Sequence, residues 1–253
     1  MRKHSNAEAW RRVKRVVRKS DVVLEVLDAR MPLRSKTLEL LVKKHSKKLI
    51  IIFNRADMVS DEKIRELKRK TKEPNLIFSA IKHWGTKKLK ERILSTGLDI
   101  PIKVGVVGYP NTGKSSLINA MLYRKAASTS PTPNWTKGEQ WLRAGKILFL
   151  DTPGVLPGGQ SETYLAIANA FDPDLLKKPI DTALKIIQIS NAKEVYGLKE
   201  EGEDALRELA KARGKLQKGG VPDINFAAKL VVREFQRGNL KRLEKVKNGS
   251  EEG

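Results

Sequence analysis

Apolar runs and amphipathic stretches alternate along roughly the first three-fifths of the chain. Short β-type runs are followed by stretches with helical periodicity. The runs span residues 21–27, 48–53, 75–78 and 102–107, and the helical stretches lie near residues 35–46, 61–71 and 86–95. Such alternation is typical of a parallel sheet with crossover helices. The pattern predicts an α/β fold with a mostly parallel sheet and helices on both faces.

The pattern changes near residue 171, where we expect this domain to end. A helix after Gly113 and a hairpin of residues 140–143 and 146–150 complete the predicted sheet. An Asp-Pro step at 172–173 and a Lys-Pro step at 178–179 then mark the junction between two domains. Beyond it the signals are helical, and the clearest helix covers residues 223–237, with Asp223 as its N-cap and Phe226, Leu230 and Val231 facing inward. The sequence thus predicts domains at 1–171 and 172–246 and a disordered tail at 247–253.

Positive charge is concentrated at the start of the chain. The net charge is +22, and residues 1–72 alone hold 22 Lys and Arg against 9 Asp and Glu. Residues 7–19 form a predicted helix with Trp10, Val13 and Val17 on one stripe, and its other side is basic, with Arg11, Arg12, Lys14, Arg15 and Arg18. Such charge favours a polyanionic partner, because Lys and Arg displace the counterions of phosphate backbones. RNA is favoured over a membrane, since no lipidation signal accompanies the charge; simple solubility charge is the alternative.

Composition narrows the class of protein further. The mean hydropathy is −0.45, and no apolar run approaches the length of a membrane span. No secretory segment is recognisable in the first residues, and the chain has no cysteine, which excludes disulfides and thiolate metal sites. We therefore expect a globular cytoplasmic protein with no membrane partner.

A phosphate-binding loop is the strongest motif. Residues 108–115 read Gly-Tyr-Pro-Asn-Thr-Gly-Lys-Ser, directly after the apolar run at 102–107 and before a helix. In this context backbone N–H groups surround phosphates, the lysine reaches the β and γ oxygens and the serine hydroxyl binds Mg²⁺. The predicted phosphate contacts are made by Asn111, Thr112, Gly113, Lys114, Ser115 and Ser116.

A second motif predicts the remaining Mg²⁺ and γ-phosphate contacts. Residues 151–154 read Asp-Thr-Pro-Gly after the apolar run 147–150, which places Asp151 at a strand end where it can hold Mg²⁺. Gly154 can donate its backbone N–H to the γ-phosphate. Between the two motifs we choose Thr136 as the switch threonine that completes the Mg²⁺ shell, with Thr129 and Thr132 as rivals.

A third motif predicts recognition of guanine. Asn54, Arg55 and Asp57 follow the run 48–53, and a carboxylate there can accept hydrogen bonds from the ring N–H and the amino group of guanine, which adenine lacks. A mismatched base would leave that carboxylate unpaired, and this penalty gives a selectivity for guanine of roughly 10³ to 10⁵. Arg55 departs from the usual lysine, although its stem can still cover the base. Ser79 and Ala80 follow the run 75–78, so the Ala80 N–H can meet the guanine carbonyl.

The three motifs occur in rotated order, which indicates a circularly permuted GTPase domain. The guanine-recognition motif at 54–57 precedes the phosphate loop, whereas in an ordinary GTPase that motif comes near the end of the domain. The chain resembles the circularly permuted ribosome-assembly GTPases of the YlqF/RbgA type. The resemblance includes Asp28-Ala29-Arg30, Gln140-Trp141 after the switch, and the segment 219–223 in the C-terminal region.

The resemblance implies a Mg²⁺-dependent GTPase that binds GTP and GDP and acts on the large ribosomal subunit. Val155 stands where many GTPases carry a water-orienting glutamine, so slow intrinsic hydrolysis is expected. Asn111 matches residues that recruit K⁺ in related groups, with bracing of the loop as the alternative. His4 lies near a family histidine proposed to act on water, but its spacing is offset and a mobile terminal histidine is the rival interpretation.

The hypothesis for the whole chain is a monomeric GTPase whose nucleotide state controls its grip on rRNA. We expect the basic N-terminal helix and the cations Lys229, Arg233 and Arg237 of the C-terminal helix to bind rRNA, and no role in DNA binding. Two alternatives stay open: a nucleotide-gated RNA-binding module with incidental turnover, and a GTPase that acts on tRNA or in translation. A P-loop ATPase is disfavoured by Asp57.

Overall fold

The computed structural model divides the chain into two compact units, Met1–Gly159 and Gln160–Gly253. It describes residues 2–69, 74–123, 141–151 and 161–241, and within 2–9 it describes the backbone alone. Among these residues no helix combines the length and apolarity that a membrane crossing requires.

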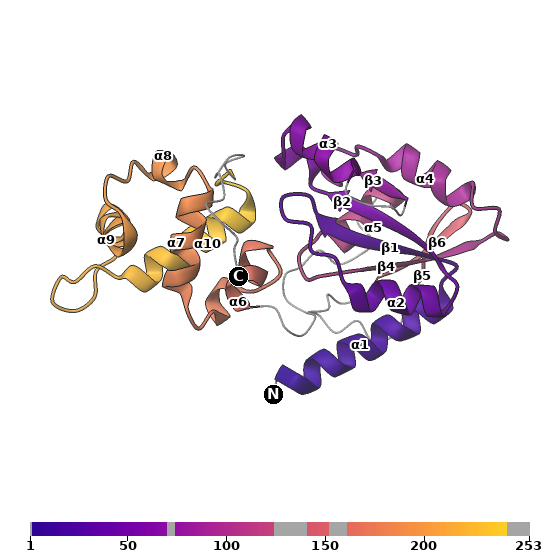
Figure 1. The fold of residues 1–253 in the computed structure, drawn as a ribbon, viewed down its shortest axis with the longest axis horizontal. Coiled ribbons are helices and arrows are strands. Elements are labelled where there is room, and N and C mark those ends of the chain that lie inside the picture. Colours follow the sequence, from indigo (N-terminus) through magenta and orange to yellow (C-terminus); the bar gives the residue numbers. More distant parts are fainter. Residues whose placement is uncertain (1, 70–73, 124–140, 152–160, 242–253) are drawn as a thin grey trace. The chain divides into compact units, whose positions relative to one another are not determined.

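The first unit is built around a six-stranded sheet with the order β3-β2-β1-β4-β6-β5 (Figure 1). Its strands are β1 (Val22–Asp28), β2 (Lys48–Asn54), β3 (Asn75–Ile77), β4 (Ile102–Gly108), β5 (Trp141–Ala144) and β6 (Ile147–Asp151). All neighbouring pairs are parallel except β5 and β6, which form the predicted hairpin. The prediction of a mostly parallel α/β sheet is therefore confirmed, and the apolar runs read from the sequence are its strands.

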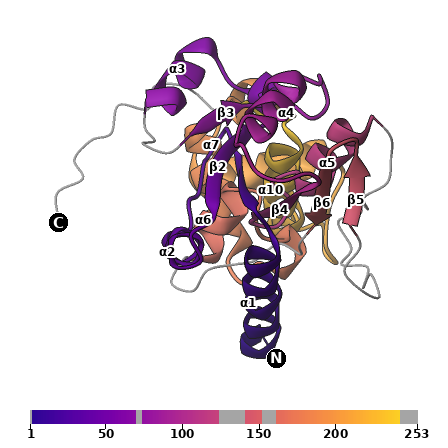
Figure 2. The same ribbon diagram turned by 90° about the vertical axis from the view of Figure 1, so that its right-hand side faces the viewer.

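Helices cover both faces of this sheet. They are α1 (Arg2–Lys19), α2 (Lys36–Lys44), the short η1 (Ala56–Met58), α3 (Asp61–Arg69), α4 (Thr86–Leu94) and α5 (Lys114–Leu122). Figures 1 and 2 show α1 and α2 on one side and α4 on the other. Alternate residues of β1 divide accordingly: Leu24 and Val26 pack with α4 and α5, while Val23 packs with α1 and α2. Burial of both faces explains why the strands are continuous apolar runs.

The basic N-terminal helix packs on the sheet as its pattern predicts. Val13 and Val17 are buried and Trp10 is partly buried, so the predicted apolar stripe is the packed side of α1. Val16 joins them. Gly105 of β4 permits the close approach, because a Cβ there would lie 2.5 Å from the Ser20 Oγ and 2.7 Å from a methyl carbon of Val16.

The second unit is helical. It holds α6 (Glu162–Ile167), η2 (Pro173–Leu175), α7 (Pro179–Ile189), α8 (Ala192–Tyr196), α9 (Gly202–Ala212) and α10 (Ile224–Arg237). Figure 1 shows α7 and α10 side by side at its centre. The predicted N-cap is present, since the Asp223 carboxylate accepts a hydrogen bond from the Phe226 N–H at 3.0 Å.

Two expectations about this unit need correction. The boundary falls between residues 159 and 160 rather than 171 and 172, because α6 packs on α7 and α10. The Gln236 amide ties this segment down by donating to the Ala166 carbonyl at 2.8 Å. The buried face of α10 is also rotated: Val231 is buried as expected, but Phe226 and Leu230 are only partly covered, and the other buried positions are Ala227, Ala228, Val232 and Phe235.

Candidate nucleotide site

The predicted site residues converge at the carboxyl ends of four neighbouring parallel strands. Asp28 ends β1, Asn54 ends β2, Gly108 ends β4 and Asp151 ends β6. Asp28 lies opposite Asn54 in the strand register, and β4 lies between β1 and β6. This edge is where open α/β sheets hold their ligands.

The phosphate loop has the backbone that its sequence requires. Gly108 has φ of 151°, and a Cβ there would come within 2.4 Å of the Val26 carbonyl oxygen. Gly113 has φ of 88° and lies so close to Asn54 that a Cβ would meet its amide nitrogen at 2.2 Å. Both positions therefore need glycine. Asn111 is exposed and has φ of 59°, a left-handed conformation that asparagine tolerates.

Lys114 begins α5 and points back into the loop. Its ammonium group donates to the Tyr109 carbonyl at 2.6 Å, and its side chain is buried. Burial lowers the pKa of Lys114 to about 8, against the opposing attraction of Asp151. An anion bound in the loop would place a negative charge beside this ammonium group, which now donates to a neutral carbonyl, and the N-terminus of α5 would add its positive dipole end.

Ser115 and Asp151 form the candidate Mg²⁺ site. The Ser115 hydroxyl donates to Asp151 Oδ2 at 2.6 Å, so a hydroxyl and a carboxylate meet beside the phosphate loop. Within the described residues there is no cluster of three or more His, Cys, Asp or Glu that could bind a metal. The pair nevertheless fits Mg²⁺, which takes oxygen ligands and is commonly held by one or two protein groups together with nucleotide phosphates.

Asn54 links the phosphate loop to the turn at Ser79 and Ala80. Its amide donates to the Thr112 carbonyl at 2.9 Å, and its carbonyl oxygen accepts the Ala80 N–H at 3.2 Å. Asp57 completes the turn by accepting a hydrogen bond from the Ser79 hydroxyl. Hydrogen bonds from one side chain thus reach backbone groups up to 59 residues away in the sequence and form one connected site.

Arg55 connects the site to Asp28 of the Asp-Ala-Arg segment. Its guanidinium donates to Asp28 Oδ2 at 3.1 Å and to the Asn111 carbonyl at 3.0 Å. Arg30 binds the same carboxylate with two nitrogens, at 3.0 and 2.7 Å. Burial lowers the pKa of Arg55, which Asp28 opposes, and an arginine stays charged even so. The guanidinium of Arg55 is therefore engaged with Asp28 and the phosphate loop, and the expectation that its stem covers the base stays a prediction.

Sequence reasoning missed the role of Asp28 and the Tyr109 carbonyl. The Asp-Ala-Arg segment carries a signal, because an aspartate at the end of an apolar run is unusual, but its partner Arg55 is separated by a whole helix and strand. Ser116 lies in the first turn of α5, partly buried. Thr129, Thr132, Thr136, Gly154, Val155 and the side chain of His4 lie outside the described residues.

The predicted RNA-binding cations differ in their surroundings. Arg11, Lys14, Arg15 and Arg18 are exposed on α1, and Arg12 is partly buried. On α10, in the second unit, the cations are paired: Arg233 donates to Asp174 at 3.0 Å, Lys229 lies 3.8 Å from the same carboxylate, and Arg237 pairs with Glu234. The positive charge of these α10 cations is thus partly neutralised.

The fold and the site define a P-loop GTPase domain whose motifs are circularly permuted. The family described as "50S ribosome-binding GTPase" matches residues 103–217, which begins at the strand before the phosphate loop. The base-reading motif lies before that match, as the rotated order requires.

Among known structures, GNP-bound YlqF from T. maritima is similar, with a TM-score of 0.67 and 26% identity, over 92% of this chain and 97% of that one. A GDP-bound structure of the same protein gives a TM-score of 0.65. Over most of its length the chain is similar to the circularly permuted GTPases of the YlqF type.

Two curated proteins are also similar to this chain in sequence. A GTP-binding protein of Methanocaldococcus jannaschii is 39% identical over 90% of this chain, and Nucleolar GTP-binding protein 2 of Saccharomyces cerevisiae is 32% identical over 94%. The chain spans 65% of the first relative and 53% of the second.

Proposed function

We propose that this protein hydrolyses GTP to GDP and phosphate in a Mg²⁺-dependent reaction. The observation that carries the proposal is the position of Asn54, whose amide group joins the phosphate loop to the Ser79–Ala80 turn. A nucleotide whose phosphates lie in the loop would present its base to Asp57 and Ala80. The YlqF structures with bound GNP and GDP support this assignment.

In this mechanism the chain mainly positions and stabilises charge. Lys114 would exchange the Tyr109 carbonyl for phosphate oxygens, and Ser115 and Asp151 would hold Mg²⁺, which neutralises developing phosphate charge. Thr136 is the proposed switch residue that completes the Mg²⁺ shell, and the Gly154 backbone N–H is the proposed contact to the γ-phosphate. Because Val155 replaces a water-orienting glutamine, we expect slow turnover without a stimulating partner, and K⁺ beside Asn111 is a candidate for added positive charge.

The proposed partner is the rRNA of the large ribosomal subunit. The net charge of +22 and the exposed cations of α1 support an RNA ligand, and the matched family is described as ribosome-binding. The α10 cations remain part of the proposal, because the Asp174 carboxylate that pairs with Lys229 and Arg233 is solvent-exposed and RNA phosphates could replace it. We propose a cytoplasmic monomer that docks on the subunit, hydrolyses GTP and is released.

A base-exchange experiment tests the nucleotide site. Asp57→Asn should weaken GTP binding and favour xanthosine triphosphate, because the asparagine amide can donate to the second carbonyl of xanthine where the carboxylate only accepts. Lys114→Ala should abolish tight binding of both nucleotides. Titration calorimetry of each variant with GTP and with xanthosine triphosphate measures these affinities; unchanged GTP affinity in either variant would contradict the site assignment.

A further inference from the structure

A cluster of exposed aromatic and basic side chains lies next to the Ser79–Ala80 turn. Ile81, Trp84 and Tyr123 expose 71%, 52% and 75% of their surface, although large apolar side chains are usually covered. We call this surface the aromatic platform; it consists of Ile81, Lys82, His83, Trp84, Lys87, Lys88 and Tyr123, all of them exposed.

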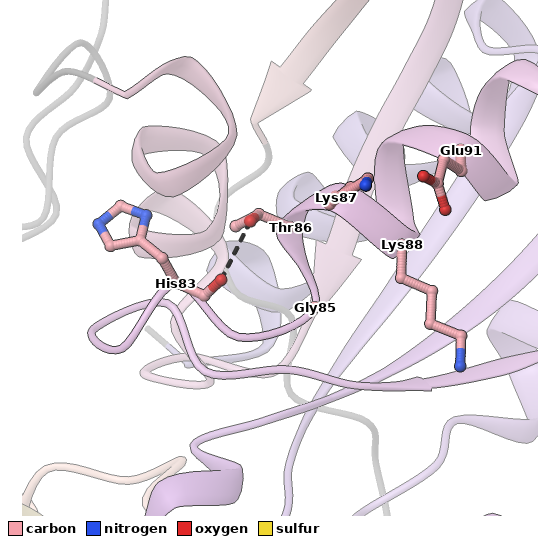
Figure 3. A pocket seen from close by; sticks show the side chains of 6 residues that line it. All are labelled: His83, Gly85, Thr86, Lys87, Lys88 and Glu91. Atoms are coloured by element: carbon pink, nitrogen blue, oxygen red, sulfur yellow. Dashed lines mark hydrogen bonds between the residues drawn. The ribbon is translucent and has the colours of Figure 1, made fainter.

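The backbone of the platform is firmly held. Ser79 and Trp84 exchange two backbone hydrogen bonds of 3.1 Å, which close the loop between them. The Thr86 hydroxyl donates to the His83 carbonyl at 3.0 Å, as Figure 3 shows. Gly85 has φ of 82° and lies against the Ile77 carbonyl, where a Cβ would approach to 2.6 Å. The exposed side chains between Ser79 and Trp84 therefore belong to a loop whose backbone is held by hydrogen bonds.

Two elements that are distant in the sequence contribute parallel rings. The ring of His83 and that of Tyr123, at the end of α5, are inclined by only 2°, with centroids 6.0 Å apart. Both side chains are exposed, so flat faces remain available to a ligand. Stacking on such faces is how proteins bind unpaired bases.

The charges around the rings complement a phosphate backbone. Lys87 and Lys88 begin α4 and, together with Glu91, line an open hollow of about 450 Å³ that also contacts His83 (Figure 3). Lys82, in the loop between Ser79 and Trp84, adds a third exposed ammonium group. Rings flanked by several cations and few acids are the combination that single-stranded RNA requires, whereas an apolar protein partner needs no such excess of charge.

We propose that the aromatic platform binds unpaired bases of RNA. The proposal rests on the RNA-binding function proposed above and adds a surface on the α4 side of the sheet, away from the basic helix α1. A base stacked on Trp84 would lie on the same loop as Ser79 and Ala80, and Tyr123 at the end of α5 is next to His83 of that loop. RNA bound here is thus placed next to the guanine-recognition turn.

The test compares unpaired with paired RNA. The intact protein is titrated into a fluorescein-labelled unstructured RNA of about twelve nucleotides and into the same sequence as a duplex, and anisotropy gives both affinities. Trp84→Ala should weaken single-strand binding roughly fivefold or more, since stacking on one ring contributes that much. Duplex affinity should not change.

Control variants separate stacking from loss of fold. Leu40→Ala removes another exposed apolar side chain on α2, which lies on the opposite face of the sheet, and should leave single-strand binding unchanged. Trp84→Phe retains an aromatic face and should retain most of the affinity. GDP binding of each variant verifies that the neighbouring turn is intact.

The outcomes distinguish the platform from the wider proposal. If the wild type binds RNA but Trp84→Ala binds single strands equally well, the platform is refuted and the RNA-binding function stands. Equal losses for strand and duplex, or a Trp84→Phe variant as weak as Trp84→Ala, would also refute stacking. If the wild type binds neither RNA, both proposals fail and a protein ligand becomes the explanation of the surface.

Discussion

At the scale of single residues, Lys114 has the most direct consequence. Burial lowers its pKa to about 8 in the nucleotide-free protein, and a bound phosphate should raise that pKa again. The bound state therefore holds more protons than the free state near pH 8, so nucleotide binding takes up protons and affinity falls as pH rises through 8.

This linkage is measurable by calorimetry. GDP binding at pH 8, titrated in buffers with different ionisation enthalpies, should show uptake of about half a proton, and this uptake should decline as the pH is lowered toward 7. Absence of uptake at pH 8 would mean that Lys114 is already charged in the free loop or does not contact the phosphates.

Asp28 provides a second residue-scale prediction. Its carboxylate is 2% exposed and is the shared partner of Arg30 and Arg55. Asp28→Asn would leave two largely buried guanidinium groups without their counter-charge, and we expect a loss of about 3 kcal/mol in unfolding free energy. Urea unfolding measures it, with the exposed Asp99→Asn as a control that should change little. If Asp28→Asn lowers the unfolding free energy as little as Asp99→Asn does, the Asp28 network contributes nothing to stability.

At the scale of elements, the packing of α1 on β4 depends on Gly105. A methyl group there would collide with Ser20 and Val16, so Gly105→Ala should displace the basic helix and cost about 1–3 kcal/mol. Thermal unfolding tests this, and Lys103→Ala, an exposed position on the same strand, is the control. If Gly105→Ala is as stable as the wild type, α1 is not held against β4 as described.

The sequence predicted elements well where one pattern determines the outcome. Strands buried on both faces are long apolar runs, so the sheet could be predicted from the sequence. The glycine spacing of the phosphate loop identifies that loop, so most of the candidate site could be predicted as well. The start of the second unit was not, because α6 is a short segment that joins it only through contacts with distant helices such as that of Gln236. The inward face of α10 was misassigned because small alanines at 227 and 228, rather than Phe226, permit close packing on α7.

Long-range pairs lay beyond what the sequence could predict. The bond from Arg55 to Asp28 forms because β1 and β2 are neighbours with Asp28 opposite Asn54. No local sequence pattern predicts that pairing. The parallel rings of His83 and Tyr123 likewise depend on the packing of α5 near the loop after β3.

At the scale of the whole molecule, a permuted GTPase unit is followed by a helical unit in one strongly basic chain. The nucleotide site and the proposed RNA contacts on α1 and the aromatic platform all belong to the first unit. Nucleotide state and RNA binding can therefore influence each other through a single sheet, and such coupling is reciprocal in free energy.

The most direct test of this account is GTP hydrolysis in KCl with purified large ribosomal subunits, small subunits or neither. The account predicts slow turnover of the protein alone, marked stimulation by the large subunit and none by the small subunit. Equal, slow rates in all three would contradict it and would leave a GTP-binding protein with a different partner.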